Sequence, residues 1–180
     1  MRVIGGELRG RRLATPPGRS AAVRPTGDRA REAVFSIIGE LLDGARVLDL
    51  FCGTGALAIE ALSRGAAGAS LVDTDPRLAR RNVIELGLRA RASVVRADAV
   101  RFLRACEGRF DLIFCDPPYR LAARLGPALS QHLPPRLARF GRLVVESSAR
   151  SPLELELPRK VSAVAERRIG EALIRIYARQ

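Results

Sequence analysis

A chain of 180 residues with 47% hydrophobic residues can bury one sizeable core, which excludes a disordered polymer and predicts a single domain over residues 1–180. No apolar run approaches the roughly 20 residues of a membrane span, and the first residues do not resemble a signal peptide, so we expect a cytoplasmic protein. The net charge of +12 favours a polyanionic partner, and nucleic acid is the most common one.

Much of the positive charge lies at the N-terminus. Residues 1–31 hold eight arginines and only two acidic residues, which is half of the net excess. Residues 2–15 alternate loosely around glycines, which predicts a basic β-hairpin, and the proline-rich stretch that follows predicts a linker. We therefore expect residues 1–23 to precede a catalytic core over 24–180. Because every basic residue except Lys160 is arginine, compositional bias is an alternative explanation of the charge.

A helix is predicted after the linker. Its apolar residues follow the i, i+4, i+7, i+8, i+11 spacing of one buried face. These residues are Ala30, Val34, Ile37, Ile38 and Leu41. Thr26 or Asp28 would cap the first turn of this helix.

From residue 46 onward, short apolar runs alternate with helical patterns. Strands are expected at residues 46–51, 69–73, 92–96, 110–115 and 142–147, and helices at 55–64, 76–87, 98–106 and 121–132. This order predicts an α/β fold in which right-handed crossovers build a parallel sheet covered by helices on both faces. Two alternating runs, at 160–167 and 171–177, predict a terminal antiparallel hairpin at the edge of the sheet.

A sharp turn from strand to helix is predicted at Gly53-Thr54-Gly55. Glycines at such a turn permit positive φ and let the backbone approach a ligand closely. In a doubly wound sheet the ligand lies outside the carboxyl ends of the strands. Asp49 lies near the end of the first strand, and Asp73 ends the second, where an acid can accept hydrogen bonds from two ribose hydroxyls. A dehydrogenase that binds NAD would show the same glycines and the same acid.

Two further strands are followed by acidic residues. Asp98 comes after the third strand, where it would meet the edge of a base, although Asp98 could equally cap the helix that begins there. The fourth strand is followed by Asp116-Pro117-Pro118-Tyr119. A hydride-transferring enzyme has no evident use for this rigid turn.

The Asp-Pro-Pro-Tyr turn suits an amino methyltransferase. The exocyclic amine of a base is a weak nucleophile, because its lone pair is delocalised into the ring. Asp116 and a prolyl carbonyl can accept its two N–H bonds and orient the nitrogen toward a methyl donor, while Tyr119 stacks on the ring. The two prolines fix φ, so the carbonyls need no reorganisation.

These motifs resemble a known family. Residues 47–55 and the turn at 116–119 are similar to those of the class I S-adenosylmethionine-dependent amino methyltransferases. The N-terminal motifs are more specific, and they resemble those of the RsmD family, the 16S rRNA (guanine(966)-N(2))-methyltransferases. They read Ile4-Gly5-Gly6-x-x-Arg9-Gly10-Arg11 and Arg24-Pro25-Thr26-x-Asp28-Arg29-x-Arg31-Glu32, followed by Phe35.

The resemblance implies a Rossmann-like class I methyltransferase fold, with a mostly parallel seven-stranded sheet, a terminal antiparallel hairpin and an N-terminal β-hairpin extension. It also implies methyl transfer from S-adenosyl-L-methionine to N2 of a guanine in 16S rRNA, in the small ribosomal subunit or its assembly intermediate. The implied cofactor-binding residues are Asp49, Phe51, Gly53, Gly55, Asp73, Asp98 and Ala99. The implied catalytic residues are Asp116, Pro117, Pro118 and Tyr119.

We expect a monomer that needs no metal, because the three cysteines and the single histidine lack metal-ligand spacing. Contacts to RNA phosphates are expected from Arg9, Arg11, Arg12, Arg24, Arg29 and Arg31. Arg24 or Arg31 could instead form a structural ion pair with Glu32 or another acid.

Two rival functions remain open. A DNA or RNA adenine-N6 or cytosine-N4 methyltransferase would share the Asp-Pro-Pro-Tyr chemistry, but such enzymes usually need a separate recognition region, for which 180 residues leave little room. A noncatalytic RNA-binding or ribosome-assembly protein would have no reason to retain all four acids and both glycines.

Overall fold

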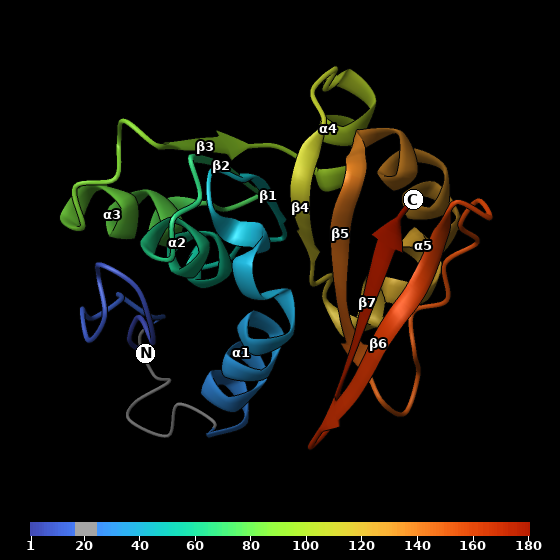
Figure 1. Cartoon of the computed structure of the whole chain (residues 1–180), viewed down its shortest axis with the longest axis horizontal. Helices are drawn as coiled ribbons and strands as arrows, with labels where there is room; N and C mark the ends of the chain where they lie inside the picture. Colours follow the sequence, from blue (N-terminus) through green and yellow to red (C-terminus); the bar gives the residue numbers. More distant parts are fainter. Residues whose placement is uncertain (17–24) are drawn as a thin grey trace.

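Seven strands of the described residues, 1–16 and 25–180 of this computed structural model, form one sheet in the order β3-β2-β1-β4-β5-β7-β6 (Figure 1). The strands are β1 (Arg46–Leu50), β2 (Gly68–Asp73), β3 (Ala92–Arg96), β4 (Phe110–Cys115), β5 (Leu137–Ser148), β6 (Val161–Ile169) and β7 (Ala172–Arg179). Strands β1 to β5 are parallel, and β7 is antiparallel to both β5 and β6. The predicted mostly parallel sheet with a terminal antiparallel hairpin is therefore confirmed.

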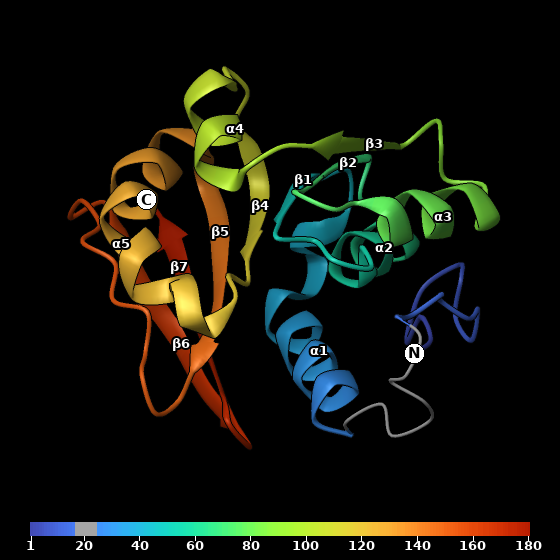
Figure 2. The same ribbon diagram turned by 180° about the vertical axis from the view of Figure 1, so that it is seen from behind.

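Helices cover both faces of this sheet (Figure 1 and Figure 2). They are α1 (Pro25–Ile38), the 3-10 helix η1 (Gly39–Leu42), α2 (Ala56–Ser63), α3 (Arg77–Glu85), α4 (Ala99–Ala105) and α5 (Tyr119–Arg136). Buried side chains of α1, α2 and α3 belong to one hydrophobic cluster, and those of α4 and α5 belong to another. The alternation along β1 explains the division, because Val47 joins the first cluster and Leu48 joins the second. None of the described helices is both long enough and apolar enough to cross a membrane.

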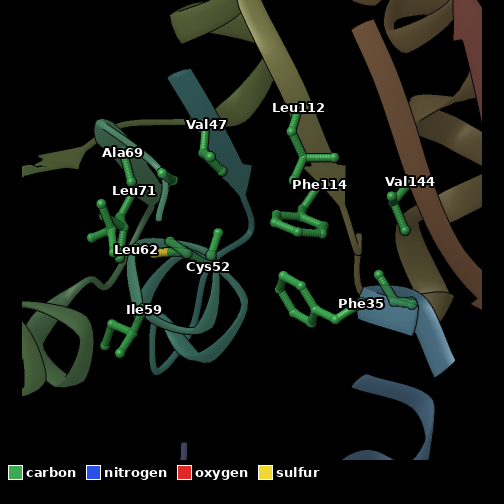
Figure 3. Close-up of a cluster of buried hydrophobic side chains, with 14 of the residues drawn as sticks. Phe35, Val47, Cys52, Ile59, Leu62, Ala69, Leu71, Leu112, Phe114 and Val144 are labelled. Carbon is green, nitrogen blue, oxygen red and sulfur yellow. The ribbon is translucent and has the colours of Figure 1, made fainter. Parts of the chain in front are cut away.

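Phe35 of α1 packs on Phe114 of β4 within the first cluster (Figure 3). Their ring centroids lie 5.7 Å apart and their planes are inclined by 56°, an arrangement that is favourable for two aromatic rings. Both side chains are almost completely buried. This contact holds α1 against the strand that leads directly into Asp116.

Most predicted elements are confirmed to within about two residues, but α5 and β5 differ. Helix α5 begins two residues earlier than expected and continues through Pro134 and Pro135 to Arg136. Strand β5 begins at Leu137 rather than at residue 142. Charged residues and Gly141 interrupt the apolar pattern before residue 142, so periodicity did not identify this part of the strand.

The buried face of α1 is shifted relative to the predicted one. Ile37 is 37% exposed, whereas Phe35 is 2% exposed. With 3.6 residues per turn, Phe35 borders the row formed by Ala30, Val34 and Ile38 and extends it on the side away from Ile37. The side chains of Thr26, Asp28 and Leu41 lie outside the part that the structure describes.

The N-terminal segment, residues 1–16, reverses direction as predicted but pairs less than a regular β-hairpin. Its antiparallel pairing is the isolated bridge between Arg2 and Arg12. The tip turns through Gly6 and Gly10, which adopt φ of 75° and 83°, and this conformation interrupts an extended strand. Val3 and Leu13 enter the first hydrophobic cluster, so the N-terminal segment packs on the core.

Glu60 of α2 is the main polar anchor of the N-terminal segment. Its two carboxylate oxygens accept hydrogen bonds from the backbone N–H groups of Ile4 and Gly5, each at 2.7 Å. Glu60 itself is fully buried and also accepts from Arg64 at 2.8 Å. Because a buried carboxylate needs such donors, the N-terminal segment completes the environment of α2.

Candidate active site

The carboxyl ends of β1 and β4 form the switch point of the sheet. From β1 the chain continues outward to β2 and β3 and then returns to β4 on the other side. Loops that leave the sheet at such a point diverge and open a crevice for a ligand. Leu50 of β1 is aligned with Cys115 of β4, so the glycine turn and the Asp116 turn begin side by side.

The turn after β1 requires glycine at Gly55. This residue has φ of 76°, and an added Cβ atom would lie 2.7 Å from Cδ2 of Leu71 and 3.3 Å from Cβ of Ala79. A side chain at position 55 would therefore collide with β2 and α3. Phe51 also has a positive φ, of 60°, which is rare for a residue with a side chain and typical of functional sites.

Asp49 lies beneath the glycine turn and is 1% exposed. Its Oδ2 accepts a hydrogen bond from the backbone N–H of Ala58 at 3.1 Å, in the first turn of α2. Gly55 at the N-cap has no side chain to satisfy such a group, so the strand supplies the missing acceptor. Burial raises the pKa of Asp49 to about 7; the Ala58 hydrogen bond opposes this rise, and the negative charge of Asp73 adds to it.

Asp73 holds the same turn from the end of β2. Its Oδ2 accepts from the N–H of Gly53 and its Oδ1 from the N–H of Asp75, both at 2.9 Å. Oδ1 also accepts a long hydrogen bond, of 3.4 Å, from the hydroxyl of Thr74. Oδ2 has a second lone pair, with which it can accept a hydrogen bond from a ligand hydroxyl.

Asn82 of α3 connects the glycine turn to the N-terminal segment. Its Nδ2 donates to the carbonyl oxygens of Thr54 at 2.9 Å and Ala14 at 3.2 Å, and its Oδ1 accepts from the N–H of Ala14 at 2.7 Å. Asn82 is 1% exposed, so these bonds form away from water and are costly to leave unmade. The sequence did not point to Asn82, because nothing in the pattern of a helix identifies the backbone groups that such a side chain reaches.

A cavity of about 450 Å³ opens at the switch point, within the usual size range of small-ligand sites. Seven predicted site residues line it: Phe51, Asp73, Ala99, Asp116, Pro117, Pro118 and Tyr119. The predicted residues Asp49, Gly53 and Gly55 do not line the cavity but shape the turn above it. A second hollow, of about 360 Å³, lies at the amino ends of the strands between Arg46 and Arg91, and no predicted site residue lines it.

Asp98 caps α4. It is exposed, and its Oδ1 accepts from the N–H of Arg101 at 2.9 Å, which is the capping alternative that the sequence left open. Its neighbour Ala99 is buried and lines the cavity. Contact of Asp98 with a base stays a prediction.

The Asp116–Tyr119 turn joins β4 to α5, and Pro118 is the N-cap residue of that helix. Burial raises the pKa of Asp116 well above its usual range, and the negative charge of Glu146 raises it further. Burial raises the pKa of Glu146 as well. Two acidic side chains therefore occupy the same poorly hydrated part of the cavity.

Glu146 is a cavity residue that the sequence analysis missed. It lies in β5, lines the cavity, and its Oε1 accepts a hydrogen bond from Oη of Tyr119 at 3.5 Å. A signal was available, because the fifth strand was predicted correctly in this region and its carboxyl end belongs to the same edge of the sheet. The strand continues to Ser148, however, so Glu146 does not stand directly before a turn as Asp73 and Asp116 do.

The two cysteines near the site, Cys52 and Cys115, are buried free thiols. Burial raises the pKa of both thiols, so they remain protonated and pack as small apolar groups. Among the described residues, no group of three or more His, Cys, Asp or Glu side chains is arranged to hold a metal ion.

The arginines predicted to contact RNA differ in exposure. Those that are exposed are Arg9, Arg11, Arg12 and Arg29. Arg31 is only 5% exposed, and its guanidinium donates to the carbonyl oxygen of Arg2 at 2.7 Å. Arg31 therefore has a structural contact with the N-terminal segment, and its contact with an RNA phosphate stays a prediction. Arg24 lies outside the described residues.

Two curated relatives match about two thirds of the chain. Ribosomal RNA small subunit methyltransferase D of Escherichia coli (strain K12) is 42% identical over 122 residues, which are 67% of this chain and 61% of that protein. The YlbH protein of Bacillus subtilis (strain 168) is 45% identical over 126 residues, which are 67% of each chain. The alignment therefore spans about three fifths of the first relative's length.

A solved structure and a family model match almost the whole chain. The structure of the yhhF protein from Escherichia coli superposes with a TM-score of 0.83 at 33% identity, and the match covers 100% of this chain and 98% of that one. The model of the family described as Conserved hypothetical protein 95 matches residues 1–178. Since this match includes the N-terminal segment, the glycine turn and the Asp-Pro-Pro-Tyr turn together, the chain belongs to that family, the RsmD family of class I S-adenosylmethionine-dependent methyltransferases.

Proposed function

We propose that this chain transfers a methyl group from S-adenosyl-L-methionine to the exocyclic N2 of a guanine in 16S rRNA, at a position of the guanine-966 type. One observation carries the proposal: Asp73 and the Asp116–Tyr119 turn line the same cavity. An acid suited to a ribose and a turn suited to an amine thus lie where two reactants could meet. The name of the Escherichia coli relative, a ribosomal RNA small subunit methyltransferase, supports ribosomal RNA as the substrate.

The residues around the glycine turn fit an adenosyl cofactor. The nearest atom to a hypothetical Cβ at Gly53 is the Phe51 carbonyl oxygen at 4.0 Å, so the backbone there is open to a ligand. Asp73 would accept hydrogen bonds from the ribose hydroxyls, and the negative charge of Asp49 would favour the cationic methionine end. When bound, S-adenosylmethionine supplies an electrophilic methyl group.

The Asp116–Tyr119 turn would orient the amine. The carboxylate of Asp116 accepts one N–H bond and a prolyl carbonyl accepts the other, which directs the nitrogen lone pair toward the methyl group. Tyr119 is 44% exposed, and its ring offers a face on which the base can stack. The amine loses its proton after methylation has begun to make the nitrogen cationic, so this arrangement needs no strong general base.

The exposed arginines Arg9, Arg11, Arg12 and Arg29 would hold phosphates of the RNA, since they add positive charge to the surface of the protein. We infer that the partner is 16S rRNA in the small ribosomal subunit or its assembly intermediate. The protein would act there as a cytoplasmic monomer without a metal.

Methyl transfer from labelled S-adenosylmethionine to small subunits from cells that lack this protein tests the proposal. We expect N2-methylguanosine in 16S rRNA after nucleoside analysis. Asp116→Ala should lower kcat by on the order of 10²-fold or more, because one preorganised acceptor for the amine is lost. Its affinity for S-adenosylhomocysteine should stay nearly unchanged, since Asp116 is assigned to the amine.

Label in N6-methyladenine, or only on DNA, would contradict the guanine substrate and favour another amino methyltransferase. If the protein binds S-adenosylhomocysteine tightly but labels no subunit at any assembly stage, the assigned acceptor is wrong. Near-normal turnover of Asp116→Ala would remove Asp116 from the mechanism.

A further inference from the structure

Glu146 of β5 and Asp116, the first residue after β4, follow aligned residues of neighbouring strands. Cys115 of β4 is aligned with Val145 of β5, and each acid comes directly after one of these two residues. Parallel strands lie about 4.8 Å apart, so the carboxyl groups leave the sheet next to one another. Both acids line the cavity of the proposed active site.

The surroundings of this acid pair provide few donors. None of the described residues that line the cavity is a lysine or an arginine. Glu146 accepts a long hydrogen bond, of 3.5 Å, from Tyr119. Burial is unfavourable for two carboxylates that have no lysine or arginine beside them among the described cavity residues, and the raised pKa of each group reflects this cost. A ligand that presents adjacent N–H donors would lower the free-energy cost of burying the two carboxylates.

Guanine has such an arrangement on its Watson–Crick edge. The N1–H donor stands directly beside the N2 amine, so two neighbouring acceptors can bind both groups at once. In adenine and cytosine the atom beside the exocyclic amine is a ring nitrogen with a lone pair, which a carboxylate would repel. The second acid therefore distinguishes guanine from the other two amino bases by charge as well as by hydrogen bonding.

We propose that Glu146 determines the base specificity of this site by accepting the N1–H of guanine, while Asp116 and the prolyl carbonyl hold the N2 amine. The inference rests on the proposed function and adds the residue that selects the base. Tyr119 then has two tasks, because its ring stacks on the base and its hydroxyl orients the Glu146 carboxylate.

2-Aminopurine separates the two roles, since it keeps the exocyclic amine at C2 but has a lone pair at N1. We compare the rates of methyl transfer to RNA that carries guanine or 2-aminopurine at the modified position, at the same pH for both substrates. A hydrogen bond to a charged group is worth about 1.5–3 kcal/mol, so the wild-type protein should favour guanine by roughly 10- to 100-fold in kcat/KM.

Glu146→Gln should abolish or invert this preference, because the amide can rotate to donate to N1 of 2-aminopurine. Glu146→Ala should bring the two rates close together by removing both acceptor and donor. Glu171→Gln is the matched control, since Glu171 is exposed, pairs with Arg150 at 3.3 Å and does not line the cavity. This control should keep the wild-type preference, and all variants should keep their affinity for S-adenosylhomocysteine.

A wild-type protein that methylates both bases equally would overturn the inference without any variant. So would a Glu146→Gln protein that binds S-adenosylhomocysteine normally and retains the full preference for guanine. Failure of the wild-type protein to methylate guanine at all would instead overturn the proposed function, so the two failures are distinguishable.

Discussion

Asp49 satisfies two requirements that conflict in the absence of a ligand. As an acceptor for the Ala58 N–H it stabilises the start of α2, but its burial disfavours the charged form. Its pKa of about 7 lies well above the ordinary value of 3.8. A cationic ligand beside the glycine turn would favour the ionised form, so cofactor binding and deprotonation of Asp49 should be coupled.

Asp49→Asn should therefore stabilise the protein without cofactor at about pH 8. The native state binds a proton more tightly than the unfolded chain, so wild-type stability falls as pH rises between about 4 and 7. The variant avoids this loss and should be more stable by roughly 2–4 kcal/mol at pH above 7, with little difference near pH 4. Its affinity for S-adenosylmethionine should be lower.

Thermal unfolding at several pH values and calorimetric titration of the cofactor measure both effects. Asp43→Asn, at an exposed acid, is the control and should keep the wild-type pH dependence. Equal pH dependence in Asp49→Asn and wild type would contradict the assignment of the raised pKa to Asp49.

At the scale of elements, the N-terminal segment is part of the fold around the site. Glu60 and Ser63 of α2 bind its backbone, and Asn82 of α3 binds both Ala14 and the glycine turn. Removing residues 1–16 would leave Glu60 buried without two of its donors and would uncover the part of the core on which Val3 and Leu13 pack. Deletion of this segment is therefore a test of stability, and RNA binding is better tested by changing its exposed arginines.

Asn82→Ala should lower both the stability of the protein and its affinity for the cofactor, because Asn82 binds both the N-terminal segment and the glycine turn. Loss of three buried hydrogen bonds should lower the free energy of unfolding by roughly 2–4 kcal/mol. The affinity for S-adenosylhomocysteine should fall several-fold, because the Thr54 carbonyl is no longer held.

Ser63→Ala is the matched control for Asn82→Ala. Ser63 accepts from the N–H of Leu8 at 2.9 Å and donates to the Gly5 carbonyl at 2.6 Å, but no hydrogen bond joins it to the glycine turn. We expect Ser63→Ala to lower the free energy of unfolding, measured by denaturation, and to retain the affinity for S-adenosylhomocysteine, measured by calorimetry. Equal losses of affinity in the two variants would show that Asn82 acts only through global stability.

At the scale of the whole molecule, the net charge of +12 should govern association with RNA. Arg9 and Arg12 are exposed on the N-terminal segment, where changing them leaves the core intact. The double variant Arg9→Gln/Arg12→Gln should weaken RNA binding by about tenfold at 0.1 M salt. The slope of log K against log salt should become shallower by roughly 1.5, as expected for two lost phosphate contacts.

Binding titrations at several salt concentrations test this expectation. Arg150→Gln serves as control, since that arginine is exposed but pairs with Glu171. An unchanged slope in the double variant would mean that the N-terminal segment does not touch the RNA backbone.

Local sequence patterns were sufficient to predict the elements whose residues repeat with a simple period. Apolar runs and glycines predicted the strands β1 to β4, the turn at Gly53 and Gly55, and the terminal hairpin, because burial and positive φ impose their requirements residue by residue. The same patterns predicted Asp73 and the Asp116–Tyr119 turn as one site, since carboxyl ends of parallel strands share one edge of the sheet.

Tertiary structure alone decided the contacts between residues far apart in the chain. The position of Glu146 beside Asp116 depends on the register of β4 and β5. The hydrogen bonds of Asn82 to Ala14 depend on how α3 packs against the N-terminal segment. The sequence placed Arg31 among the RNA-binding arginines, whereas packing of α1 against Arg2 buries it. Charge and periodicity belong to the sequence, but which polar group finds which partner depends on the packing of the elements.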